Sequence, residues 1–199
     1  MNPVLAIQPH LRVTLLEALP PARSMALHSM LTASGYASPE TALGTLKALL
    51  SSTAQPPPSA LRTAREFVAS LGTLQRASHV HLVLMRAREA GNWQSAVDLW
   101  DDWQKASGGK KGHAANEIGA REGQQIWFLL INILKKSKKG ERALKMFHLM
   151  QKRGVPADEW VCNDVLTAVL SCGDVEAAWA FASSRWALVA GGEEAGAAV

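Results

Sequence analysis

The sequence predicts an all-α fold, an α-solenoid of helix–turn–helix repeats. Helix start and stop signals are dense, and the segments between them carry apolar residues at helical spacing. Strand signals are poor, because no run alternates cleanly between apolar and polar residues. The layout also recurs with a period of about 35 residues, which is typical of stacked repeats. A chain of 199 residues, 48% hydrophobic and 19% charged, suits one globular domain or one short repeat array.

Residues 1–58 predict a degenerate helical region. Ser38 offers an N-cap, followed by a first-turn proline and a first-turn acid at Glu40. The three prolines at 56–58 must interrupt any helix. A new helix is expected directly after them, with Ser59 as its N-cap.

Residues 59–104 predict a region with one clear repeat. Ala96, Trp100 and Trp103 lie at i, i+4 and i+7, which places them on one face of a helix. A C-terminal glycine followed by an asparagine N-cap, at 91–92, starts that helix. We therefore expect this face to be buried.

The next part of the chain predicts an insertion followed by two repeats. Ala143, Phe147 and Met150 show the same one-face spacing as the preceding repeat. Gly173-Asp174 repeats the earlier stop-and-cap signal, with Glu176 in the first turn. The predicted segments are a Gly/Ala/Lys-rich insertion loop at 105–123, repeats at 124–158 and 159–188, and a flexible tail at 189–199.

Aligning one alanine from each repeat brings the three turns into register. The step from Ala143 to Ala178 is 35 residues, and the step from Ala96 to Ala143 is 47 because of the insertion. The turn residues that then align, five positions earlier, are Gly91, Lys138 and Gly173. A fixed period with paired helices indicates an α-solenoid.

Positive charge is concentrated in one segment. The net charge is +4, but residues 105–153 carry 12 Lys or Arg and 3 Asp or Glu. Residues 154–199 carry 1 Lys or Arg and 7 Asp or Glu. Such asymmetry is typical of contact with a polyanion.

The run 135–142 is expected at the turn between two paired helices. With the basic residues that follow, it predicts a localised positive edge that contacts phosphates in a salt-dependent, sequence-tolerant way. A solvated turn on a basic protein is the alternative interpretation. The candidate phosphate-binding residues are Lys135, Lys136, Lys138, Lys139, Arg142, Lys145, Lys152 and Arg153.

Enzyme signatures are absent from the sequence. It contains no Walker-type loop, no H-E-x-x-H and no G-x-S-x-G motif. The acidic cluster at 98–102 is read as a solvated helix face. Cys162 and Cys172 lack Cys or His partners at metal spacing, so reduced thiols are favoured over a zinc site. We expect no enzyme, cofactor, metal or small-molecule substrate, and no membrane span, because no apolar run reaches 18 residues.

The stretch "ERALKMFHLMQKRGVPADEWVCNDVLTAVLSCGDVEAAW" carries a family pattern. It resembles the pentatricopeptide repeat family, which favours Ala-Leu-x-x-Phe-x-x-Met, a glycine, a Pro-Asp ending and an early asparagine in the next helix. Pro156 is one residue early, and the segment 81–103 fits with Trp100 and Trp103 replacing Phe and Met. The resemblance covers 78–186, and a tetratricopeptide-like or other α-solenoid is the alternative. The matching residues are Ala143, Leu144, Phe147, Met150, Gly154, Asp158 and Asn163.

The resemblance implies that the first helix of each repeat reads one RNA base. Asn163 and Asp158 have suitable side chains for a base edge but belong to successive repeats, and Phe128 cannot hydrogen-bond an edge. Trp160 is either a base-stacking residue or a packed anchor between repeats. The base-reading candidates are His81, Phe128, Asp158, Trp160 and Asn163.

The function implied by the resemblance is organellar RNA metabolism: RNA processing, stability, editing or translation. Expected partners are single-stranded RNA and other proteins of a ribonucleoprotein complex, in the mitochondrion or alternatively the chloroplast. Three repeats would read at most about three bases, too few to specify a transcript. The alternative is a protein–protein scaffold, for example in a mitochondrial ribosome, without direct sequence-specific reading of RNA.

Overall fold

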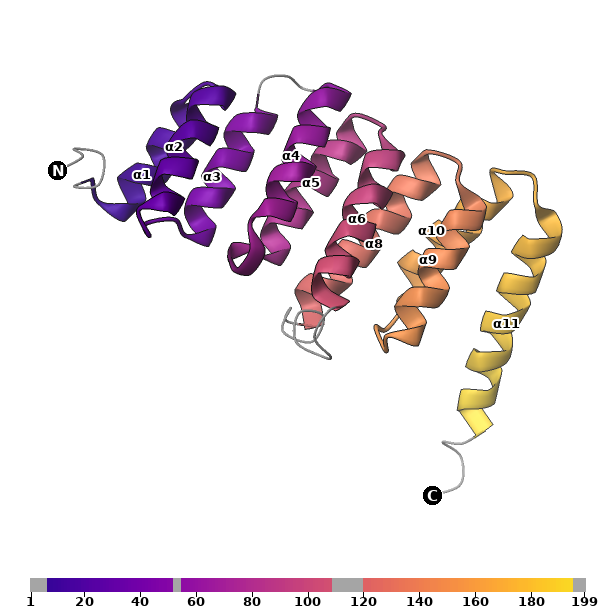
Figure 1. Cartoon of the computed structure of the whole chain (residues 1–199). Coiled ribbons are helices and arrows are strands. Elements are labelled where there is room, and N and C mark those ends of the chain that lie inside the picture. Colours follow the sequence, from indigo (N-terminus) through magenta and orange to yellow (C-terminus); the bar gives the residue numbers. More distant parts are fainter. Residues whose placement is uncertain (1–6, 52–54, 109–119, 195–199) are drawn as a thin grey trace. The chain divides into compact units, whose positions relative to one another are not determined.

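The computed structural model describes residues 7–51, 55–108 and 120–194, and within these ranges the chain is helical without strands (Figure 1). The prediction of an all-α fold is therefore confirmed. The chain consists of two compact units, residues 1–129 and residues 130–199. No described helix is both long enough and apolar enough to cross a bilayer.

The helices of the first unit are α1 (Pro9–Ala18), α2 (Pro21–Ala33), α3 (Pro39–Leu50), α4 (Pro58–Ser70), α5 (Ala77–Glu89), α6 (Trp93–Gly108) and the first part of α8 (Ala120–Lys136), with a 3-10 turn at Gly72–Leu74. From α1 to α6, each helix packs on the helix that follows it. Contacts also skip one helix, joining α1 to α3, α3 to α5 and α4 to α6. This gives a repeat-like packing of successive helices.

The second unit contains the end of α8 and three further helices. These are α9 (Gly140–Lys152), α10 (Glu159–Leu170) and α11 (Val175–Glu194). The middle helix, α10, packs on both α9 and α11. One end of α10 adjoins the connection from α9, and the other end adjoins the connection to α11. The candidate sites are found at these two connections.

Buried aromatic residues hold each unit together. Trp100 is 2% exposed, and its ring centroid lies 5.2 Å from that of Trp103 and 4.3 Å from that of Trp127. In the second unit, Phe147 meets Phe181 edge to face at 5.0 Å. Both predicted helix faces are buried, because Ala96 and Ala143 are also nearly inaccessible.

Three turns share a left-handed residue at the aligned positions. Their φ values are 64° at Gly91, 53° at Lys138 and 79° at Gly173. Glycine adopts this conformation freely, whereas a lysine pays about 1–2 kcal/mol for it. The same turn geometry is thus maintained at the end of α8 despite the unfavourable residue.

Helix caps mostly follow the sequence signals. The Ser38 hydroxyl accepts a hydrogen bond from the Thr41 N–H at 3.3 Å, and Asn92 and Asp174 cap α6 and α11 in the same way. The expected cap at Ser59 is wrong. The helix α4 already begins at Pro58, with Pro57 at the N-cap position and no side-chain cap, because proline suits the first helical turn.

Helices extend into the predicted insertion from both sides. α6 continues to Gly108 and α8 begins at Ala120, while residues 109–119 lie outside the described part of the chain. Good helix formers such as Gln104, Lys105 and Arg121 explain this extension. Likewise α11 continues to Glu194, into the segment expected to be a flexible tail.

Candidate nucleic-acid interface

The connection between α9 and α10 gathers several of the predicted RNA-binding residues. Lys152 is the last residue of α9, and Arg153 is its C-cap. Asp158 is the N-cap of α10, and Trp160 follows in the first turn of that helix. All four side chains are exposed, and so is Asn163 one turn further on. We call Lys152, Arg153, Trp160 and Asn163 the α9–α10 patch.

Trp160 is the most exposed large hydrophobic residue of this patch. It is 81% exposed, so it is not a buried anchor within the described structure. Asn163 lies three residues later, which places both side chains on neighbouring positions of one helix face. An exposed indole can stack on a base, and a neighbouring amide can bond a base edge.

Asp158 has a structural task as well. Its Oδ1 accepts a hydrogen bond from the Val161 N–H at 2.9 Å, which is N-cap geometry. One carboxylate oxygen therefore satisfies the start of α10. This capping role accounts for an aspartate at this position without any base contact.

Two other base-reading candidates belong to the first unit. His81 lies on α5 and Phe128 on α8, and both side chains are half-buried. Neither is part of the α9–α10 patch. Phe128 can contribute stacking only, since its ring offers no hydrogen-bonding group.

Lys135 does not act as a free phosphate-binding cation. Its ammonium lies 2.5 Å from Oδ1 of Asp164, and both side chains are about three-quarters buried. Asn132 donates a hydrogen bond to Oδ2 of the same carboxylate at 3.0 Å. The assignment of Lys135 to phosphate binding therefore needs correction, because an internal carboxylate already neutralises it.

The predicted basic residues extend along the whole of α9. Lys136, Lys138, Lys139 and Arg142 lie around its start, Lys145 lies near its middle, and Lys152 and Arg153 lie at its end. The helix has 13 residues, so its two ends are about 20 Å apart at 1.5 Å per residue. A positive edge along α9 stays a prediction, and its two ends can be tested separately.

The cations at the start of α9 border a cavity of about 410 Å³. Lys138, Lys139 and Arg142 line it together with Asp174 and Cys172. The Gly140 N–H donates to the Cys172 sulfur at 3.1 Å, and the thiol donates to the Lys138 carbonyl at 3.0 Å. The thiol thus ties the turn to the end of α10. Both cysteines are free.

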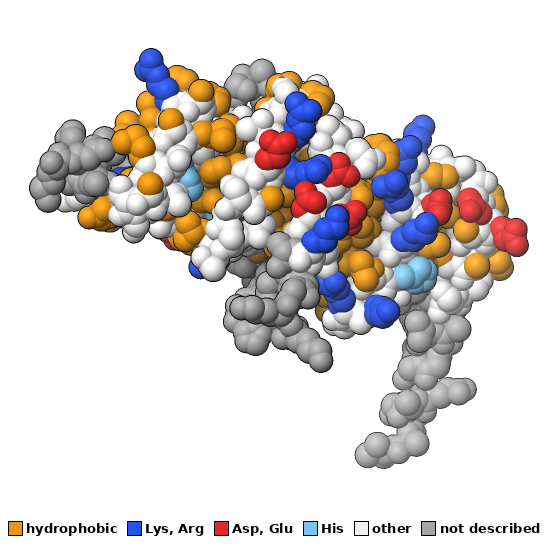
Figure 2. Space-filling model, in the orientation of Figure 1, with side chains coloured by type: hydrophobic (Ala, Val, Ile, Leu, Met, Phe, Trp, Pro, Cys, Tyr) orange, Lys and Arg blue, Asp and Glu red, His pale blue; other side chains and the backbone are white. Residues whose placement is uncertain are grey.

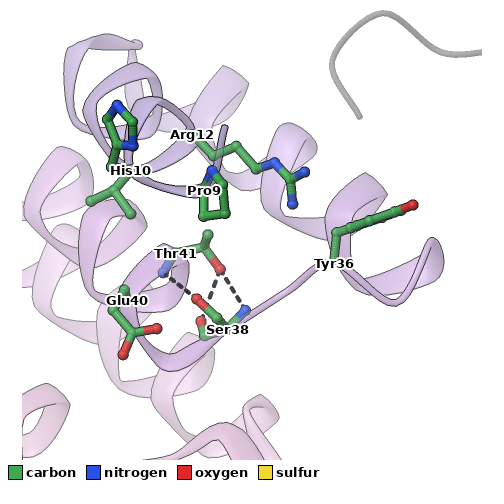
Figure 3. A pocket seen from close by; sticks show the side chains of 8 residues that line it. Pro9, His10, Arg12, Tyr36, Ser38, Glu40 and Thr41 are labelled. Atoms are coloured by element: carbon green, nitrogen blue, oxygen red, sulfur yellow. Dashed lines mark hydrogen bonds between the residues drawn. The ribbon is translucent and has the colours of Figure 1, made fainter. Parts of the chain in front are cut away.

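A second cavity, of about 630 Å³, lies near the N-terminal helices (Figure 3). The Arg12 guanidinium carbon is 4.8 Å from the centroid of the Tyr36 ring, and the Arg12 Nε–H donates to the Ile7 carbonyl. Ser38 and Thr41 bond each other as a capping box on its wall. The Ser38 and Thr41 side chains cap the start of α3, and the described lining includes none of the predicted RNA-binding residues.

Neither a protein-family model nor a curated protein matches the chain. Among the described residues, no group of three or more His, Cys, Asp or Glu side chains is arranged to hold a metal ion.

The sequence missed two features of the surface. Arg65 of α4 pairs with Asp98 and Asp102 of α6, each at 2.8 Å, so this acidic cluster is not simply a solvated face. Trp179 of α11 is 75% exposed. Trp179 aligns with half-buried Leu144 of α9, 35 residues earlier in the repeat pattern. This alignment was the signal in the sequence, because a large apolar side chain at this repeat position needs a neighbouring helix to cover it.

Proposed function

We propose that this protein is a pentatricopeptide-like α-solenoid that binds single-stranded RNA through the α9–α10 patch. It acts by binding rather than by catalysis, as a helical adaptor in an RNA–protein complex. The observation that carries this proposal is Trp160, an 81% exposed indole that shares its connection with Lys152 and Arg153. A stacking surface beside cations is the combination that single-stranded nucleic acids need.

Each residue of the patch has a distinct task in this proposal. The Trp160 indole stacks on a base, an interaction worth about 1–3 kcal/mol. The Asn163 amide offers both a donor and an acceptor to the edge of a neighbouring base. Lys152 and Arg153 contact phosphates, which makes the affinity depend on salt.

The wider role rests on the family resemblance. The resemblance implies a role in organellar RNA processing, stability, editing or translation, in the mitochondrion or alternatively the chloroplast. The repeat-like packing of neighbouring helices supports the solenoid architecture. With so few base-reading side chains, target selection falls to the other proteins of the ribonucleoprotein complex.

A protein–protein scaffold, for example a mitochondrial ribosomal subunit, is the second candidate. Two observations favour this scaffold function. The Asp158 carboxylate already caps α10, and Trp179 offers an exposed apolar surface outside the α9–α10 patch. In this case the chain would join an RNA–protein complex without touching RNA.

A mobility-shift titration distinguishes the two functions. Purified protein is titrated into single-stranded RNA of about 12 nucleotides at about 50 mM and about 200 mM salt. RNA binding that weakens at the higher salt supports the proposal. Absence of binding to any single-stranded RNA at the lower salt contradicts it and leaves the scaffold function.

A further inference from the structure

The outer side of α11 carries an exposed apolar pair. Val175 is 67% exposed and Trp179 is 75% exposed. They lie four residues apart, so they are neighbours on one side of the helix. Among the α11 residues whose side chains the structure describes, Ala178 and Phe181 are buried, so the buried side of this helix adjoins the exposed pair. We call Val175, Glu176 and Trp179 the α11 face.

The corresponding side of α9 receives a helix. The residues 35 positions earlier are Gly140 and Leu144. A Cβ atom on Gly140 would lie 2.7 Å from Cα of Val169 on α10, and Leu144 lines the cavity shared with Val169 and Ala177. The register of the helices therefore assigns the α11 face to contact with another helix.

A helix that covers the α11 face cannot pack as closely on α11 as α10 packs on α9. Close approach there depends on the missing side chain of Gly140. Val175 stands at the equivalent position of α11, and its isopropyl group needs space that a close backbone would fill. A helix that docks on the α11 face must therefore lie further out and be held by side chains, chiefly around Trp179.

The exposed charged residues next to this pair in the chain are acidic. Asp174 and Glu176 are exposed, and residues 154–184 contain no Lys or Arg. Lys138, Lys139 and Arg142 of α9 line the cavity that Asp174 and Ala177 border. Figure 2 shows acidic and hydrophobic side chains next to one another on the last helices. An occupant with positive charge beside its apolar stripe complements this surface.

We infer that the α11 face docks an amphipathic helix of a partner protein, with an apolar stripe flanked by Lys or Arg. Trp179 is the anchor, because a large exposed indole buries the most apolar area on binding. Glu176 pairs with a cation at the edge of the contact. This protein-binding surface lies on a different helix from the α9–α10 patch and functions whether or not that patch binds RNA.

The test uses the full chain and a synthetic helical peptide of about 18 residues, or five turns. One peptide has a leucine stripe flanked by lysines, and its control has glutamates in place of the lysines. Binding is measured by fluorescence anisotropy of the labelled peptide. Trp179→Ser is compared with Trp160→Ser, a matched change of an exposed tryptophan, and with Glu176→Lys.

The lysine peptide is expected to bind and the glutamate peptide is not. Trp179→Ser should weaken binding at least tenfold and Glu176→Lys by several-fold, while Trp160→Ser should change it less than twofold. Equal affinity for the Trp179→Ser and unaltered chains would overturn the inference, as would equal binding of both peptides. Sedimentation showing a self-association that Trp179→Ser abolishes would also overturn it, by identifying a second copy as the occupant.

Discussion

The ammonium of Lys135 lies 2.5 Å from the carboxylate of Asp164, which joins the end of α8 to α10 within the second unit. The same carboxylate accepts a hydrogen bond from Asn132 at 3.0 Å. Lys135 therefore serves the packing of these helices. Its charge is not available to RNA in the way that its place in a lysine-rich run suggests.

Replacement of Asp164 by alanine should destabilise the protein by about 1 kcal/mol, since it leaves two partly buried partners without their acceptor. Urea unfolding followed by circular dichroism measures the change. Glu141→Ala is the control, because its ion pair with Lys145 is highly exposed and should contribute little. A larger loss for Glu141→Ala than for Asp164→Ala would contradict this ranking.

Replacement of Trp160 by alanine should weaken binding of single-stranded RNA about tenfold or more, because it removes the stacking surface. The side chain is 81% exposed, so the free energy of unfolding should change little. Trp179→Ala, a similarly exposed change on α11, is the matched control. Equal loss of RNA affinity in the two variants would show that Trp160 has no special role.

Gly140→Ala should destabilise the second unit by about 1–3 kcal/mol, as overpacking does. A Cβ atom at this position would lie 2.7 Å from Cα of Val169 and 2.8 Å from the Ala168 carbonyl oxygen, so α10 must move. Thermal unfolding measures the effect. Exposed Lys145→Ala on the same helix is the control, and an unchanged melting temperature for Gly140→Ala would refute the close approach of α9 and α10.

The stability of the protein should fall as the pH drops below about 6.5. Burial lowers the pKa of His79 below its usual 6.5. Its Nδ1 accepts the Arg76 N–H at 3.0 Å, and its Nε2 donates to the Pro39 carbonyl at 2.9 Å, so the neutral ring suits both partners. Burial, followed by the charge of His79, also lowers the pKa of His28.

The unfolded chain takes up protons at these histidines near pH 6.5, before the folded chain does. The stabilisation is therefore complete above that pH and is lost progressively as the pH falls toward the lower pKa values of the folded protein. Urea unfolding between about pH 7 and about pH 5 measures the slope. His79→Gln should reduce the slope relative to the unaltered chain. The same slope in both chains would contradict this origin.

The all-helical fold class could be predicted from the sequence because it depends on local signals, namely helix caps and the spacing of apolar residues. Ser38, Asn92 and Asp174 cap the helices that they were expected to cap. The apolar faces around Trp100 and Phe147 are buried as their spacing requires. Helix ends were harder to predict at 105–123, because glycines compete there with good helix formers and local preference does not decide.

The candidate site depends on distance and pairing, which a sequence does not show directly. The basic residues from Lys135 to Arg153 are close together in the sequence, but the length of α9 separates the first of them from the last in space. The partner of Lys135 is Asp164, which is 29 residues away in the chain. The exposure of Trp160 was equally hidden, since the same spacing suits a buried anchor.

The most direct test of RNA binding at the α9–α10 patch compares two double variants at several salt concentrations. Lys152→Glu with Arg153→Glu alters the patch, and Lys138→Glu with Lys139→Glu alters the other end of α9. Fluorescence anisotropy with labelled single-stranded RNA gives the affinity and its salt dependence. The account predicts that the first variant loses most of its affinity and that its log–log salt slope falls by about 1.4, from two lost phosphate contacts, while the second variant keeps most of both. Unchanged affinity and slope in the Lys152/Arg153 variant would contradict the account.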